Sequence, residues 1–96
     1  AQQRFHSEAL APQFDQALAN VLAVLAVAGG RAEHICRMTA YCCDRPAYLA
    51  ARPALGAIWR RHMGTHYPAM SMIFVSDLLD HPACVELEAT AVLPGA

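Results

Sequence analysis

The feature that most constrains this chain is an apolar pattern at helical spacing that stops at two glycines. Apolar side chains recur every three or four residues, at Leu10, Phe14, Leu18, Val21, Leu25 and Ala28. This period predicts an amphipathic helix over residues 10–28. Gly29 and Gly30 follow at once, and glycine is typical just beyond a helix C-terminus. Residues 1–7 are polar and lack the period, so they are expected to precede the helix.

A second helix is predicted to begin after Asp44, which is a good cap residue, with Pro46 in its first turn. It runs to about Met63, and Gly64 ends it. Pro53 removes one internal hydrogen bond, which predicts a kink or a restart there.

Three segments are predicted to be strands, at residues 34–43, 69–75 and 84–92. In the first, the face expected to lie under a helix carries Cys36, Met38, Ala40 and Cys42. A turn near Asp80, His81 and Pro82 joins the other two. The order helix, strand, helix, strand, strand indicates an α+β fold with both helices on one face of the sheet.

That arrangement leaves the second face of the sheet open in a single chain. The residues assigned to this open face are Arg37, Tyr41, Met70, Met72, Phe74, Glu86 and Glu88. The set is too apolar for a freely solvated surface and too charged for a closed core. It predicts a subunit interface that carries a cleft.

Length and charge exclude several classes of protein. The 96 residues fit one domain, and the net charge is −1. All seven cationic side chains are arginine, so the sequence offers neither a Schiff-base lysine nor a P-loop lysine. The absence of a basic face disfavours nucleic-acid binding. No run of about 18 apolar residues is free of charge, so no membrane association is expected.

The cysteines and histidines do not form a recognisable metal or nucleophile motif. The spacing of Cys36, Cys42, Cys43 and Cys84 matches no zinc site and is typical of reduced thiols in a cytoplasmic protein. No partnered base can be identified for a cysteine nucleophile. His62 and His66 have the spacing of helical metal ligands, but Gly64 lies between them and no third ligand is evident.

Four segments together resemble the Rid/YjgF family of small trimeric proteins. The first helix resembles the family's first helix through Gln13, Leu18, Asn20, Val21, Leu25, Ala28 and Gly29. The strand HICRMTAYCCD follows it, and HYPAMS and VELEATAVL resemble the family's two closing strands. The match covers about residues 10–93. It implies a chorismate-mutase-like α+β fold, a single domain over residues 1–96, and a homotrimer with clefts between subunits.

The resemblance also implies a chemistry. Active family members hydrolyse reactive enamines and imines without a metal or cofactor, and a glutamate on the last strand manages a water or a proton. Glu86 matches that glutamate, and the alternative is an interface carboxylate paired with Arg37. The family arginine that grips a substrate carboxylate is replaced by Met70, and a thioether offers no such grip. Candidate ligand-binding residues are therefore Met70, Met72, Phe74, Tyr41 and Arg52.

Several alternatives stay open at this stage. Met70, Met72 and Phe74 also fit plain interface packing, Glu88 fits a salt bridge, and Arg52 fits a solvated helix position. The loss of the arginine equally fits a non-catalytic ligand-binding or regulatory trimer. An RNA-cleaving role, also attributed to the family, is disfavoured by the charge. The chain begins where the family's N-terminal β-hairpin should be ending, so the domain is expected to lack that hairpin.

Overall fold

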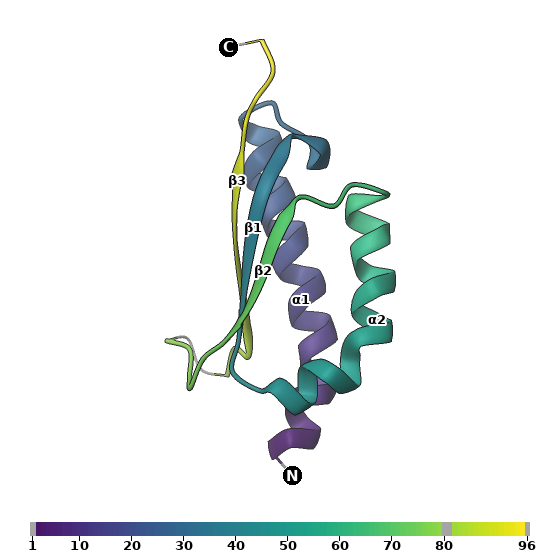
Figure 1. Cartoon of the computed structure of the whole chain (residues 1–96), viewed down its shortest axis with the longest axis vertical. Coiled ribbons are helices and arrows are strands. Elements are labelled where there is room, and N and C mark those ends of the chain that lie inside the picture. The colour runs from purple at the N-terminus through teal and green to yellow at the C-terminus, as the bar shows by residue number, and fades with distance from the viewer. Residues whose placement is uncertain (1, 80–81, 96) are drawn as a thin grey trace.

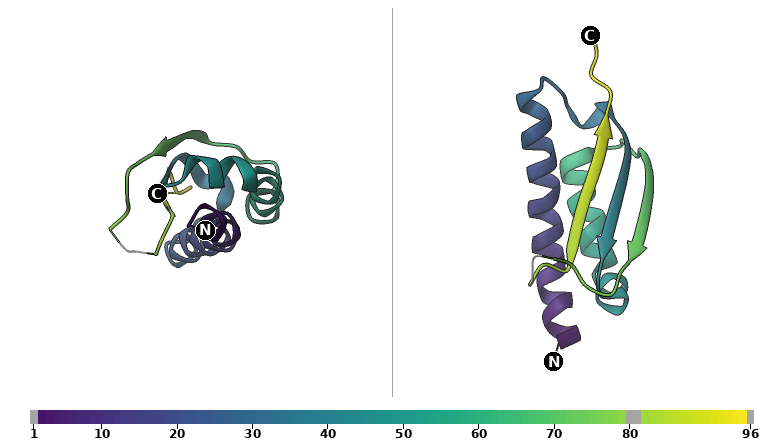
Figure 2. Two further views of the ribbon diagram at one scale, coloured as in Figure 1. Left: turned by 90° about the horizontal axis from the view of Figure 1, so that it is seen from below. Right: turned by 90° about the vertical axis from the view of Figure 1, so that its left-hand side faces the viewer.

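The computed structural model describes residues 2–79 and 82–95, and it places two helices against one face of a three-stranded sheet (Figure 1). The elements follow the predicted order, with a short 3₁₀ turn before the first strand. They are α1 (Gln2–Val27), η1 (Ala32–His34), β1 (Ile35–Cys42), α2 (Arg45–Met63), β2 (Ala69–Phe74) and β3 (Val85–Ala91). The predicted α+β class with both helices on one face is confirmed (Figure 2). The predicted turn includes Asp80 and His81, which lie outside the described residues.

Helix α1 begins at Gln2 rather than near Leu10, so the prediction of its start was wrong. The apolar pattern begins only at Leu10. Residues 2–9 lack this pattern, but most of them are good helix formers, so the helix extends through them. The helix ends at Val27, next to the predicted end at residue 28. Gly29 adopts a φ of +85°, a left-handed conformation that ends a helix. The Gly30 N–H donates to the Leu25 carbonyl at 2.9 Å, and the Gly29 N–H donates to that of Ala26 at 3.0 Å. These two bonds form a Schellman motif.

Helix α2 is capped at both ends by the residues that the sequence indicates. The Asp44 carboxylate accepts a hydrogen bond from the Ala47 N–H at 3.0 Å. The Gly64 N–H donates to the Arg60 carbonyl at 2.9 Å, with Gly64 at a φ of +62°. The helix is continuous through Pro53, but its first turns run at a marked angle to the rest in Figure 1, as a proline inside a helix predicts.

The sheet has the order β2-β1-β3, with β1 in the centre. Strand β1 pairs with β2 in parallel and with β3 in antiparallel orientation. Helix α2 connects the two parallel strands, while α1 packs beside α2 and against β3. The antiparallel pairing has an irregularity between Ile35 and Arg37.

One layer of apolar side chains fills the space between the helices and the sheet. Strand β1 contributes Ile35, Met38, Ala40 and Cys42, which are all buried. The helices contribute the buried residues Leu10, Phe14, Leu18, Ala47, Ala51, Leu55, Ile58, Trp59 and Met63. The prediction that Cys36 lies under a helix was wrong. Cys36 is exposed and Ile35 is buried, because the irregularity at this point shifts the alternation.

The register also corrects the face assigned to β2. Met70 and Met72 pair with Met38 and Ala40 of β1, and Phe74 pairs with Cys42. Residues directly opposite each other in neighbouring strands share a face. Met70, Met72 and Phe74 therefore lie on the helix-covered face and not on the open face.

Residues Ala9–Val27 of α1 are long and apolar enough, by length and composition alone, to cross a membrane. Mostly buried core helices of globular domains and signal sequences meet the same criterion, and 17% of this segment is buried in the structure. Here Leu10, Phe14 and Leu18 form part of the core, and Asp15 lies within the segment and bonds to α2.

Candidate functional site

A pocket of about 280 Å³ opens between α2 and the β2 edge of the sheet. Strand β2 supplies Met70 and Met72, which form the sheet side of the pocket. Aromatic and apolar groups form most of the remaining wall, and the lining residues are Phe14, Tyr48, Arg52, Leu55, Gly56, Trp59 and Tyr67. Concave, mostly apolar sites with few polar groups are typical of small-molecule binding.

The loop between α2 and β2 is held so that an aromatic pair forms one wall. The Trp59 indole N–H donates to the His66 carbonyl at 3.2 Å. The His66 Nε2 lies 2.8 Å from the Ile35 carbonyl, to which it donates, and so ties the loop to β1. Tyr67 follows His66 and stacks on Trp59, with ring centroids 5.8 Å apart and an interplanar angle of 18°.

Arg52 is the only charged side chain among the described residues that line the pocket. It lies on the exposed side of α2. Other arginines have partners, since Arg31 pairs with Glu33 and Arg61 with Asp15. No ion-pair partner for Arg52 occurs within residues 9–79 and 82–95.

Phe74 lies at the end of β2, next to the pocket rather than in its wall. Its ring meets that of Tyr48 edge-on, with centroids 5.6 Å apart. The Arg45 guanidinium lies 5.9 Å from the centroid of the Phe74 ring. Phe74 therefore supports Tyr48, which does line the pocket.

The open face carries the other predicted site residues. Glu86 pairs in register with Tyr41, is exposed, and has no hydrogen-bond or ion-pair partner among the described residues. Within the described residues of one chain, Glu86 forms no ion pair with Arg37, and a pair across a subunit interface stays a prediction. The Tyr41 hydroxyl donates instead to Glu88 Oε1 at 3.0 Å. That hydrogen bond, together with burial and the charge of Glu88, raises the pKa of Tyr41.

The sequence-predicted site residues thus fall into two groups on opposite faces of the sheet. Met70, Met72 and Arg52 share the pocket, whereas Tyr41 and Glu86 lie on the open face. Sequence reasoning missed the aromatic wall made by Tyr48, Trp59 and Tyr67. Two signals pointed toward it: Trp59 is the only tryptophan in the chain, and Tyr67 lies inside the HYPAMS segment.

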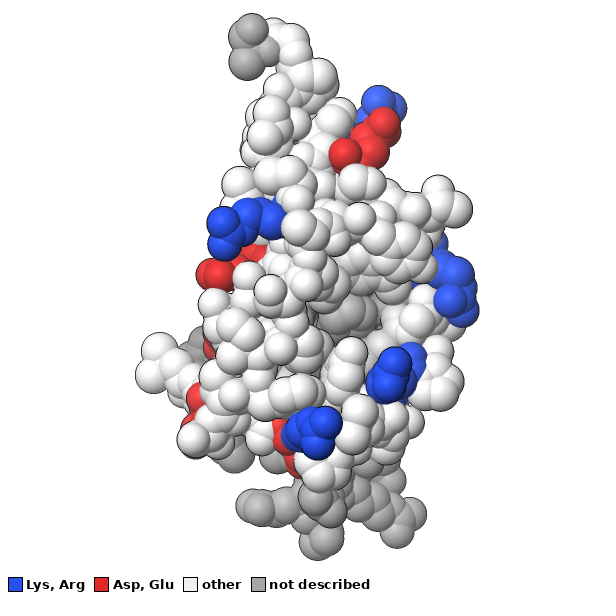
Figure 3. Space-filling view, viewed as in Figure 1, with Lys and Arg blue, Asp and Glu red and all other residues white. Residues whose placement is uncertain are grey.

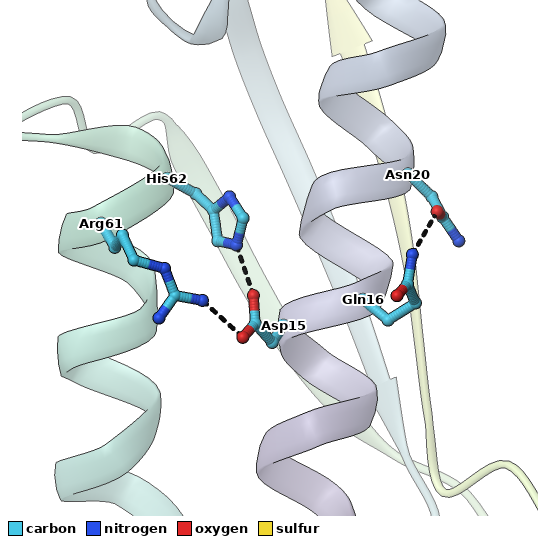
Figure 4. Close-up of polar contacts among 5 residues, drawn as sticks. All are labelled: Asp15, Gln16, Asn20, Arg61 and His62. Carbon is cyan, nitrogen blue, oxygen red and sulfur yellow. Dashed lines mark hydrogen bonds and ion pairs between the residues drawn. The ribbon is translucent and has the colours of Figure 1, made fainter.

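His62 and His66 do not converge on a metal site. His62 Nε2 lies 2.6 Å from Asp15 Oδ1, and Asp15 also pairs with Arg61, so these residues join α1 to α2 (Figure 4). Hydrogen bonds from His62 and Arg61 lower the pKa of the Asp15 carboxyl. No group of three or more possible metal ligands occurs among the described residues.

The thiols near the end of β1 are poor nucleophiles. Burial raises the pKa of Cys42 and Cys43, and it raises that of Cys84 to about 11. They therefore stay protonated near neutral pH. All four cysteines are free thiols.

Charge is dispersed over the surface. On the face shown in Figure 3, the described arginine side chains stand apart and form no continuous basic patch. The described residues on this face therefore offer no continuous basic track for a phosphate backbone.

Comparison with known proteins gives consistent matches. The family model described as Endoribonuclease L-PSP matches residues 1–93. The conserved Rid-family protein YyfB from Yersinia pestis is 35% identical with a TM-score of 0.75, over 88% of this chain and 62% of that one. Rv2704 from Mycobacterium tuberculosis, of the YjgF/YER057c/UK114 family, is 26% identical with a TM-score of 0.74, over 88% and 68%.

A third similar structure is Escherichia coli TdcF with bound serine, at 27% identity and a TM-score of 0.74, over 88% of this chain and 65% of that one. The chain therefore spans about two thirds of the length of these structures. No curated protein matches the sequence.

Proposed function

Because the chain belongs to the YjgF/Rid family, we propose that it binds a small molecule in the pocket between α2 and β2. The observation that carries this proposal is the pocket itself, which combines Met70 and Met72 with an aromatic wall and one arginine. The similar TdcF structure holds serine, which supports a small ligand for this fold. The volume of about 280 Å³ also suits a small metabolite.

The proposed reaction is hydrolysis of an enamine or imine in the cleft of a homotrimer. Water would add to the carbon of the C=N bond, and ammonia would leave as the carbonyl forms. Glu86 would take a proton from the water and return one to the nitrogen. Its carboxylate is exposed and has no hydrogen-bond or ion-pair partner among the described residues, so it is free to accept a proton.

The trimer is part of this proposal because one chain separates the two halves of the site. Met70 faces the helices, and Glu86 faces away from them on the open face. Glu86 can meet a ligand in the pocket only if it comes from a neighbouring subunit. The uncovered sheet face, with Tyr41 and the half-exposed Ile73, supports such a contact.

A non-catalytic binding or regulatory trimer is the second candidate. It is favoured by Met70, which stands where active family members carry the arginine that grips a carboxylate. Charged hydrogen bonds contribute about 1.5–3 kcal/mol each, so the loss of two weakens such a grip strongly.

The test is ammonia release from amino-acid imines generated in situ. The unmodified chain should release ammonia faster than the uncatalysed control, and Glu86→Gln should abolish the excess. Gly56→Leu should also abolish it, since the new side chain fills the pocket. A Cβ on Gly56 would meet Arg60 Nη1 at 3.5 Å, an ordinary contact, and thermal denaturation checks that the leucine variant is folded.

Three outcomes separate the candidates. Ligand binding without turnover in the unmodified chain would favour the regulatory trimer, especially if Met70→Arg gained activity. Turnover that survives Glu86→Gln would contradict the role of Glu86. A monomer by sedimentation equilibrium, with full activity, would contradict the shared cleft.

A further inference from the structure

The walls of the pocket are formed mostly by aromatic and apolar side chains. Trp59 is 6% exposed, and its indole N–H already donates a hydrogen bond to the His66 carbonyl. Tyr67, which is 67% exposed, stacks on Trp59 and forms the rim. Met70 and Met72 close the sheet side with thioethers, which make favourable contacts with aromatic rings. A flat aromatic group would bury its faces here without leaving a polar atom unpaired.

Charge in the pocket has one sign. Arg52 lines it without an ion-pair partner among the described residues, and none of the described lining residues is acidic. An aromatic wall alone would also suit a cation, through its negative ring faces. The guanidinium of Arg52 repels a cation and attracts an anion, and its planar fork matches a carboxylate.

Size limits the ligand further. The volume of about 280 Å³ lies at the low end of small-molecule sites. One ring with a short acidic arm fits this space.

We propose that the pocket selects small aromatic carboxylates, with Trp59 and Tyr67 against the ring and Arg52 of α2 supplying the cation. This inference rests on the proposed function, because it concerns the ligand class of the same pocket. In this inference the cation that binds the carboxylate lies on α2, on the other side of the pocket from Met70, which occupies the position of the family arginine on β2.

The test uses Trp59 as its reporter, because it is the only tryptophan of the chain and lies in the pocket. Quenching of its fluorescence is titrated with 3-phenylpropionate, 3-phenylpropionamide, 3-phenylpropylamine and propionate. The aromatic acid should bind about 10- to 100-fold more tightly than its amide, as a charged, bidentate contact predicts. 3-Phenylpropylamine should bind more weakly than the amide, because its charge is positive. Propionate should bind more weakly than 3-phenylpropionate, because it lacks the ring.

Variants then assign the preference to Arg52. Arg52→Gln should remove most of the difference between acid and amide, because it weakens binding of the acid far more than binding of the amide. Arg52→Lys should restore part of the difference, because it keeps the charge without the fork. Arg31→Gln is the matched control, since it removes the same charge outside the pocket, and it should leave the preference intact.

The outcomes separate this inference from the proposed function. The role of Arg52 would be overturned by equal affinity for acid and amide in the unmodified chain, or by a preference for the acid that survives Arg52→Gln. Neither result would contradict ligand binding in the pocket. Binding of propionate as tight as that of the aromatic acid would overturn the role of the ring. If none of the probes quenches Trp59, the inference about aromatic carboxylates fails, whereas the proposed function is decided separately by the ammonia-release assay.

Discussion

The two faces of the sheet differ in what covers them, although both come from the same alternating strands. On the helix-covered face, Met38, Ala40 and Cys42 are buried under α1 and α2. On the other face, no described element covers Thr39 and Tyr41, and charged groups such as Glu86 stand free. The covered face has a gap over Met70 and Met72, and the candidate pocket lies there. The candidate pocket therefore lies on the helix side of the sheet, and the proposed general base lies on the opposite side.

The largest expected contrast comes from two neighbouring residues on opposite faces. Met38→Ala should lower the free energy of unfolding by about 2–5 kcal/mol, because Met38 is 2% exposed and its loss leaves a cavity. Thr39→Ala should change it by no more than about 0.5 kcal/mol, as is usual for a position outside the core. Urea denaturation of both variants measures the contrast. A large loss in Thr39→Ala that does not depend on concentration would contradict the contrast, whereas a concentration-dependent loss would show that the open face is buried between subunits, as the proposed trimer requires.

The sequence allowed the order of elements, both helix C-termini and the Asp44 cap to be predicted, because these depend on local chemistry. Glycine at positive φ and a carboxylate at a helix N-terminus act within a few residues. The face of β2 could not be predicted in this way. Met70 and Met72 alternate with Ser71 and Ile73, so either face is plausible from the strand alone. Only the parallel register with β1 decides the matter, and that pairing is long-range.

The same limit explains the mixed outcome at the site. Arg52 and Met70 are 18 positions apart in the chain, and only the packing of α2 beside β2 brings them to one pocket. Trp59 and Tyr67 meet because two hydrogen bonds of His66 hold the intervening loop. The spacing of His62 and His66 resembles that of metal ligands on a helix, and it does not indicate that His66 holds the loop between α2 and β2.

The next largest effect concerns the gap in the covered face. Gly56→Ala should raise the free energy of unfolding by about 0.5–1 kcal/mol, because glycine inside a helix is less favourable than alanine by that amount. The added Cβ meets Arg60 Nη1 at 3.5 Å, an ordinary contact. Thermal and urea denaturation check the result. A loss of stability would mean that the pocket wall at this position is filled rather than open.

A smaller effect is expected where α1 joins α2. Bonds from His62 and Arg61 hold the pKa of Asp15 below its ordinary value of 3.8. The stabilisation is therefore present above about pH 3.8 and is lost as the pH falls through the lowered value. Asp15→Asn should be less stable than the unmodified chain near neutral pH, and the gap should close in acid. Denaturation midpoints between pH 2 and pH 7 measure it.

Glu33→Gln is the control for this experiment, because Glu33 pairs with Arg31 at a highly exposed position. Its stability difference should be smaller and should depend less on pH. An equal pH dependence in the two variants would contradict a specific contribution from the bonds between the helices in Figure 4.

The smallest expected effect lies on the open face and concerns a pKa rather than stability. Tyr41 donates to the Glu88 carboxylate, which favours the neutral phenol and raises the pKa of Tyr41 above 10.0. Glu88→Gln should lower that pKa, and an NMR titration of the Tyr41 ring, identified with Tyr41→Phe, measures the change. Glu86→Gln is the matched control, because Glu86 faces Tyr41 in register without bonding to it. Equal shifts in the two variants would mean that general charge, not the hydrogen bond, sets the pKa. The open face would then be a diffuse acidic surface, with Glu86 and Glu88 interchangeable, and the assignment of a distinct role to Glu86 would lose its structural basis.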